Sequence, residues 1–134
     1  MTSTQHADTP KRDLLTRPII AVGLWGVPLA MGWGADAVFH PGPLTDVIWA
    51  VALAWMGGGC ALNAWECHRL HCYLAAPILF LGAAGMAAVA VGFAPLGVRT
   101  ASLVINVSLG LALLTFIAEP VWGKYRHRSR DEEE

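Results

Sequence analysis

The chain has 134 residues and a formal net charge of −1, with 55% hydrophobic and only 14% charged residues. Soluble domains carry roughly 25% charged residues, so this composition excludes a soluble globular protein, a disordered chain and a disulfide-rich secreted domain. It also leaves no room for a separate soluble catalytic or nucleic-acid-binding domain. We therefore predict no nucleic-acid partner and favour a non-enzymatic role over an enzyme.

Four long stretches of the chain contain no Asp, Glu, Lys or Arg. Each is close to the ~20 apolar residues that a helix needs to cross a bilayer core. We predict an all-α integral membrane protein, built as a bundle of four transmembrane helices. A disordered tail (1–16) precedes the transmembrane domain (17–123), and a charged tail (124–134) follows it. The helices are expected at 18–39, 44–65, 73–93 and 100–122.

The first predicted helix has two notable features. Pro28 lies in its middle and should bend it, as membrane helices tolerate. Its basic start, apolar core and the sequence Ala35-Asp36-Ala37 also resemble a signal peptide. Cleavage would leave three helices, so this alternative stays open. Asp36 and Asp46 flank the turn after this helix, where they would either form a vestibule that attracts cations or be solvated helix ends.

Small residues recur in the second and third predicted helices. Ala50, Ala54 and Gly58 repeat at four-residue spacing, the last within the run Gly57-Gly58-Gly59, and the third helix contains Gly82 and Gly85. Small side chains let helix backbones approach closely in lipid. The sequence therefore predicts that these two helices pack tightly as a hairpin.

The fourth predicted helix carries few polar residues. Asn106 and Ser108 lie in its outer half and are expected to form hydrogen bonds to other helices. Glu119 lies near its opposite end, where it would pair with Arg69 or join the ligand cluster described below.

The basic residues predict the orientation in the membrane. All but one of the nine Lys and Arg residues lie in the N-terminal tail, in the loop between the second and third helices, or after the fourth helix; Arg99 is the exception. Four crossings place these three segments on one side. By the positive-inside rule, both termini and this loop are cytoplasmic.

Reactive side chains are concentrated between the second and third helices. If the second helix continues through this segment, Cys60, Asn63, Cys67 and His71 share one helical face. Thiolate and imidazole suit thiophilic ions such as mercury, copper(I) or zinc. The predicted metal ligands are Cys60, Cys67, His68, His71 and Cys72, supported by Asn63, Glu66, Arg69 and Glu119. A purely structural role for the cluster remains the alternative, with Cys60 as a small buried apolar residue.

The cluster also carries a resemblance. Its pattern, followed by Pro77, resembles one in small bacterial inner-membrane proteins, over about a fifth of the chain: Cys60-x-x-Asn63-x-x-x-Cys67-x-Arg69-x-His71-Cys72-Tyr73. In its size and its cysteines beside a span, the chain is loosely similar to the small mercury-resistance membrane transporters. It differs from them because the first helix has no cysteine pair. The resemblance implies a multi-pass protein of the bacterial inner (plasma) membrane.

Three functions are compatible with these patterns. The first is binding or transport of a soft metal ion through the cysteine and histidine ligands. The second is a non-catalytic accessory or assembly subunit of a membrane complex, and the third is a membrane thiol-redox protein. Besides the lipid bilayer, the expected partners are a second copy of the chain or another membrane protein.

Overall fold

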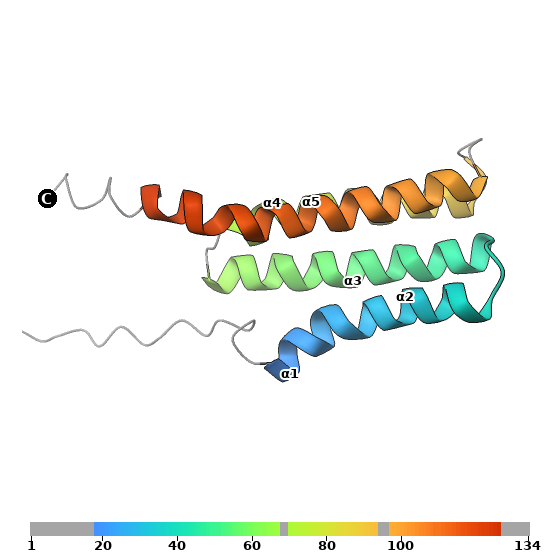
Figure 1. Cartoon of the computed structure of the whole chain (residues 1–134), viewed down its shortest axis with the longest axis horizontal. Coiled ribbons are helices and arrows are strands. Elements are labelled where there is room, and N and C mark those ends of the chain that lie inside the picture. Colours follow the sequence, from blue (N-terminus) through green and yellow to red (C-terminus); the bar gives the residue numbers. More distant parts are fainter. Residues whose placement is uncertain (1–17, 68–69, 94–96, 127–134) are drawn as a thin grey trace, which may run out of the picture.

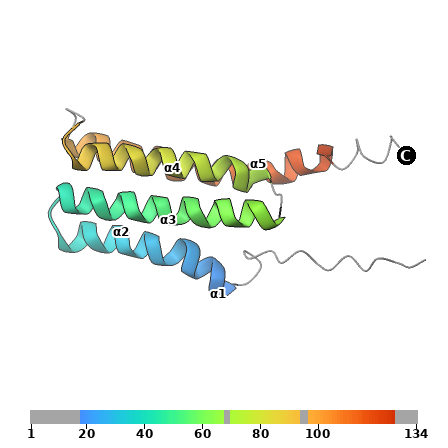
Figure 2. The same cartoon turned by 180° about the vertical axis from the view of Figure 1, so that it is seen from behind.

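A computed structural model describes the backbone of residues 18–67, 70–93 and 97–126, and the side chains of these ranges except 66–67, 70, 97–98 and 119–126. In this part of the chain all regular structure is helical, in long rods that lie alongside one another (Figures 1 and 2). The first rod has three segments, and each of the others is one helix. In chain order the elements are α1 (Pro18–Ala21), the π-helix η2 (Val22–Gly26), α2 (Val27–Val38), α3 (Pro43–Cys67), α4 (Leu70–Ala90) and α5 (Gly97–Arg126).

Within the described residues, four helical spans are long and apolar enough to cross a membrane. Their apolar side chains remain largely exposed along the bundle, which is the pattern expected where lipid rather than water surrounds the helices. The prediction of four helices that are long and apolar enough to span a membrane is confirmed, and this pattern is typical of a multi-pass membrane protein. The spans are Pro18–Val38, Pro43–Trp65, His71–Ala90 and Arg99–Ala118.

The helices pack in chain order: α2 against α3, α3 against α4, and α4 against α5. In Figure 1 the start of α1 and the end of α5 lie at the same end of the bundle, as does the end of α3. The segments 39–42 and 91–93 lie at the opposite end. An even number of crossings therefore brings the two ends of the described chain together.

The first rod departs from a regular helix just before Pro28. The π-turn η2 ends with the Val27 N–H donating to the Val22 carbonyl, five residues back. A proline inside a helix has no N–H to donate, and its ring clashes with the carbonyl four residues earlier. A wider π-turn is one way to accommodate this defect. The irregularity predicted at Pro28 is present one turn earlier, at Val22–Gly26.

The third span ends at Ala90, earlier than the predicted position 93. Gly92 adopts a positive φ of 74°, its N–H donates to the Val89 carbonyl at 3.0 Å, and the Phe93 N–H donates to the Ala88 carbonyl at 2.9 Å. These two bonds form the Schellman motif that ends many helices. Glycine takes the left-handed conformation without a Cβ penalty, so the helix stops there.

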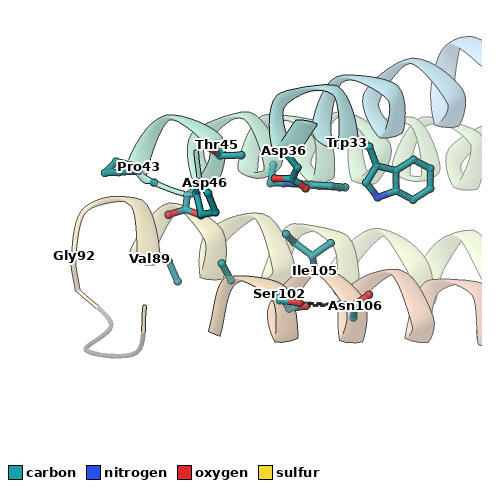
Figure 3. Close-up of a pocket in the computed structure, with 14 residues that line it drawn as sticks. Trp33, Asp36, Pro43, Thr45, Asp46, Val89, Gly92, Ser102, Ile105 and Asn106 are labelled. Atoms are coloured by element: carbon teal, nitrogen blue, oxygen red, sulfur yellow. Dashed lines mark hydrogen bonds between the residues drawn. The ribbon is translucent and has the colours of Figure 1, made fainter. Parts of the chain in front are cut away.

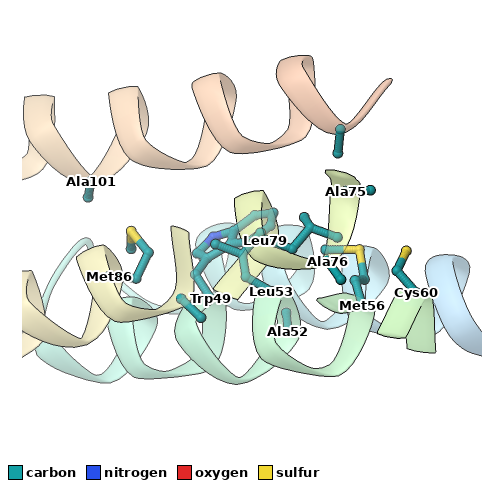
Figure 4. Close-up of a cluster of buried hydrophobic side chains, with 12 residues drawn as sticks. Trp49, Ala52, Leu53, Met56, Cys60, Ala75, Ala76, Leu79, Met86 and Ala101 are labelled. Carbon is teal, nitrogen blue, oxygen red and sulfur yellow. The ribbon is translucent and has the colours of Figure 1, made fainter. Parts of the chain in front are cut away.

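The core lies mainly between α3 and α4 (Figure 4). Leu53, Met56, Leu79 and Met86 are fully buried in it. The predicted α3–α4 hairpin is thus present, but the close approach to α4 lies at Gly57 rather than at Gly58 of the four-residue repeat. A Cβ on Gly58 would meet nothing within 4 Å.

The glycine at this close approach is Gly57, where a Cβ would lie 3.3 Å from Leu79 and 3.4 Å from the Ala76 carbonyl oxygen. Ala50 and Ala54 are only partly buried against the core. A four-residue spacing drifts little around a helix, so it identifies a stripe of small residues without fixing the direction in which that stripe faces. The tertiary packing placed the contact one residue earlier.

Among the described residues, neither of the two polar side chains that were predicted to bond between helices, Asn106 and Ser108, forms such a hydrogen bond. Ser108 is buried where α5 approaches Gly82 of α4, and no side chain larger than hydrogen fits at that glycine. Asn106 is exposed and donates within its own helix, to the Ser102 carbonyl at 2.8 Å and the Ser102 Oγ at 3.2 Å. Asn106 therefore contributes to a surface of α5 rather than to a bond between helices.

Candidate functional site

The predicted ligand cluster lies on two helices instead of one. Helix α3 ends at Cys67 and α4 begins at Leu70, so α3 does not continue to His71. The condition for a single face of Cys60, Asn63, Cys67 and His71, a second helix that continues through the segment, is therefore not met. A continuous helix here would leave the two apolar spans unpacked, whereas the two separate helices bury their faces against each other.

The hairpin itself brings three polar side chains together. Asn63 of α3 donates its Nδ2 to Cys72 Sγ of α4 at 3.3 Å, and His71 Nε2 lies 3.0 Å from the same sulfur. All three side chains are buried, with exposures of 0–2%. Polar groups in such an environment are stable only when they are hydrogen-bonded. The contacts among these three side chains therefore provide hydrogen-bond partners for polar groups that are buried away from solvent.

Cys60 lies beside this trio, one helical turn before Asn63. It is a free, fully buried thiol within the α3–α4 core (Figure 4). Like Cys72, it is fully buried. We call Cys60, Asn63, His71 and Cys72 together the thiol cluster.

One aromatic side chain packs on the imidazole of the thiol cluster, and a second packs on the first. The ring of Phe116 on α5 lies 4.5 Å from that of His71, tilted by 37°. Trp25 in η2 meets Phe116 edge-on, with ring centroids 5.5 Å apart and an interplanar angle of 76°. The first and last rods thus close over a site made by the middle two. Nothing in the sequence distinguishes Phe116 from the other apolar residues of its helix, so sequence reasoning missed it.

The other predicted site residues cannot be placed at the cluster. His68 and Arg69 lie outside the described residues, and so do the side chains of Glu66, Cys67 and Glu119. Among the side chains that are described, no three His, Cys, Asp or Glu residues form a group able to hold a metal ion. The described part of the cluster therefore offers a close nitrogen–sulfur pair with a second thiol nearby.

This pair has defined chemical properties. The Asn63 amide donates to the Cys72 sulfur, which fixes the position of that sulfur. With Zn–S and Zn–N bonds of ~2.3 and ~2.1 Å, two ligands of a tetrahedral ion stand about 3.6 Å apart. The observed separation of 3.0 Å would have to widen by roughly half an ångström, which side-chain rotation allows. The pair could also share one proton in the absence of any metal.

No protein-family profile, no curated protein and no solved structure matches this chain. Inference about function therefore depends on the side chains themselves.

Proposed function

We propose that the protein is a multi-pass protein of the bacterial inner membrane that binds a soft metal ion at the thiol cluster and passes it across or along the membrane. The observation that carries the proposal is the buried contact of Cys72 Sγ with both Asn63 Nδ2 and His71 Nε2. Polar and ionisable side chains are costly inside a membrane and by default indicate function.

The proposed orientation has both termini in the cytoplasm. The described chain starts and ends at the same end of the bundle (Figure 1), and all but one of the basic residues of the sequence precede the first span, lie between the second and third, or follow the fourth. The positive-inside rule assigns this end to the cytoplasm. The thiol cluster then lies in the cytoplasmic half of the bundle, where cellular thiols would accept the ion.

Each side chain of the cluster has a proposed role. Cys72 and His71 are the two proposed ligands, and Cys60 would join them only after a rearrangement, since the three described side chains do not form a metal-holding group in the structure. Asn63 acts as a positioning residue that keeps the Cys72 sulfur ready to bind. Structural zinc sites use four ligands, so two or three donors with two sulfurs favour mercury(II) or copper(I) over zinc. Cys67 and His68 remain candidate ligands on the cytoplasmic side, and a second copy of the chain or a partner protein would extend the path.

Metal analysis of the detergent-purified protein tests this proposal. The protein is loaded with mercury(II), copper(I) or zinc under reducing conditions, desalted and assayed for bound metal. We expect about one ion per chain or per dimer, near-complete loss in Cys72→Ser, and weaker retention in Cys60→Ser. Ser102→Ala, at the other end of the bundle, is the control and should bind normally. Equal metal binding by a variant in which all three cysteines are Ser contradicts binding at the thiol cluster.

Two other outcomes would point to the alternative functions. A Cys60–Cys72 disulfide that forms as a quinone is reduced, with two electrons and two protons passing to the quinone, would indicate a thiol-redox protein. Unchanged cellular function in every cysteine variant, with loss in Arg69→Ala, would indicate an accessory subunit.

A further inference from the structure

A cavity of about 530 Å³ lies at the end of the bundle opposite the thiol cluster. It is formed where α2 and the start of α3 face the end of α4 and the first turns of α5 (Figure 3). Pockets that bind small organic ligands typically measure ~300–1,000 Å³. The cavity is therefore large enough for an organic molecule and much larger than a bare metal ion requires.

Two carboxylates line this cavity. Asp36 accepts a hydrogen bond from Trp49 Nε1 at 3.0 Å, and Trp49 is almost completely buried, so the carboxylate is held by a fixed donor. Asp46 lies in the first turn of α3 and lines the same cavity as Asp36 (Figure 3). A cation bound between them would be attracted by both carboxylates.

The lining provides no positive charge to balance the two carboxylates. None of the fourteen described residues around the cavity is Lys, Arg or His. His40 and Arg99 lie at the same end of the bundle, yet neither lines the cavity. Among the described side chains, the lining thus has an unbalanced negative charge that favours a positively charged ligand.

The remaining walls are aromatic, apolar and weakly polar. Trp33 is 60% exposed and presents an indole, the side chain that binds cations best through its face. Val89 and Ile105 contribute apolar surface, and Asn106 keeps its amide nitrogen bonded to Ser102. Carboxylates beside an indole and apolar surface match a cation that carries carbon groups, because a strongly hydrated metal ion gains little from apolar walls.

We propose that this cavity binds a small organic ammonium ion, with Asp36 and Asp46 supplying the charge and Trp33 contacting the alkyl groups. The ammonium group would belong either to a small soluble ammonium compound or to the headgroup of a membrane lipid, since both present a cation that carries carbon groups. The site is separate from the thiol cluster and does not depend on the proposed metal binding.

Calorimetric titration of the full-length protein in a maltoside detergent tests whether the ligand is a soluble ammonium compound, with choline as the probe. The control ligand is 3,3-dimethylbutan-1-ol, which has the same shape but no charge. We expect saturable choline binding, at least tenfold weaker binding of the alcohol, and at least tenfold weaker choline binding by Asp36→Asn. Asparagine still accepts the Trp49 hydrogen bond, so this variant removes the charge and keeps the contact.

Two further variants distinguish loss of the cavity from misfolding of the protein. Val89→Phe fills the cavity without changing its charge and should abolish choline binding, whereas Gly110→Ala, at a position of α5 where an added Cβ meets nothing within 4 Å, should leave it unchanged. The lipid source is tested by mass spectrometry of protein purified from mixed phosphatidylethanolamine and phosphatidylglycerol. Retention of phosphatidylethanolamine that is lost in Asp36→Asn supports a headgroup ligand. Equal binding of choline and the alcohol, Mg²⁺ binding in place of choline, or neither choline nor lipid binding overturns the proposal.

Discussion

The contact between α2 and α3 at Gly32 gives the sharpest test of the fold. Gly32 is buried against the indole of Trp49, and a Cβ added there would lie 2.7 Å from three carbons of that ring. Gly34, two residues later on the same helix, has nothing within 4 Å of its Cβ position. Gly32→Ala and Gly34→Ala therefore make the same chemical change in a crowded and in an open place.

The expected difference follows from three contributions. Alanine is favoured over glycine inside a helix by ~1 kcal/mol, and this gain is common to both variants, so it cancels. Carbon atoms pack best at ~3.5–4.0 Å, so at Gly32 the ring must move by about 0.8 Å or more. Overpacking of this kind costs ~1–3 kcal/mol. Displacing the indole also weakens its bond to Asp36, at about 1 kcal/mol or more.

We therefore expect Gly32→Ala to be about 2–4 kcal/mol less stable than Gly34→Ala, a factor of roughly 30 to 1,000 in the unfolding equilibrium. The measurement is reversible unfolding of the purified protein in mixed maltoside and dodecyl sulfate micelles, followed by tryptophan fluorescence. A Trp49→Ala background should remove most of the difference, because it removes the obstructing ring. Equal stability of the two glycine variants would refute the packing of α2 on α3. A purified protein that lacks the first helix, as cleavage of a signal peptide would produce, would refute it as well.

Three further predictions concern the thiol cluster and the topology. On a background without the third cysteine, Cys60 and Cys72 should resist a hydrophilic maleimide until the protein is unfolded, because both are fully buried; rapid labelling of the folded protein would contradict their burial. Phe116→Ala removes two ring contacts and should lower stability by about 2 kcal/mol, as measured by the same micelle titration, and should expose the imidazole of His71; unchanged stability would show that α5 does not pack there. A reporter fused after the C-terminal tail should be active only in the cytoplasm, and external activity would reverse the proposed orientation.

The hydrophobic pattern was sufficient to predict the number and type of the spans. Runs without charge cannot be solvated in water at this length, and a backbone in lipid must satisfy its own hydrogen bonds, which a helix does. Local signals also identified some of the details. The irregularity beside Pro28 follows from the chemistry of one residue, whereas the end of α4 was predicted at 93, three residues too late, because Gly92 was not used as the helix terminator.

Four of the nine predicted site residues lie together in the structure, Cys60, Asn63, His71 and Cys72, but their geometry was not predicted. The spacing would have arranged them along one helix only if the second helix continued to His71. Only the packing of α4 against α3 places Cys72 across from Asn63. Helical periodicity describes neighbours within an element and contains no information about which residues meet across a turn.

The sequence by itself thus determined an all-helical chain with four apolar spans and a concentration of thiols and imidazoles between the second and third. The tertiary structure alone decided that His71 meets Phe116 of the last helix, and that Asp36 and Asp46 line a common cavity. The physical reason is that apolarity and periodicity act along the chain, whereas these contacts depend on the rotation of each helix about its axis. That rotation is set by the steric fit of particular side chains, such as Trp49 against Gly32.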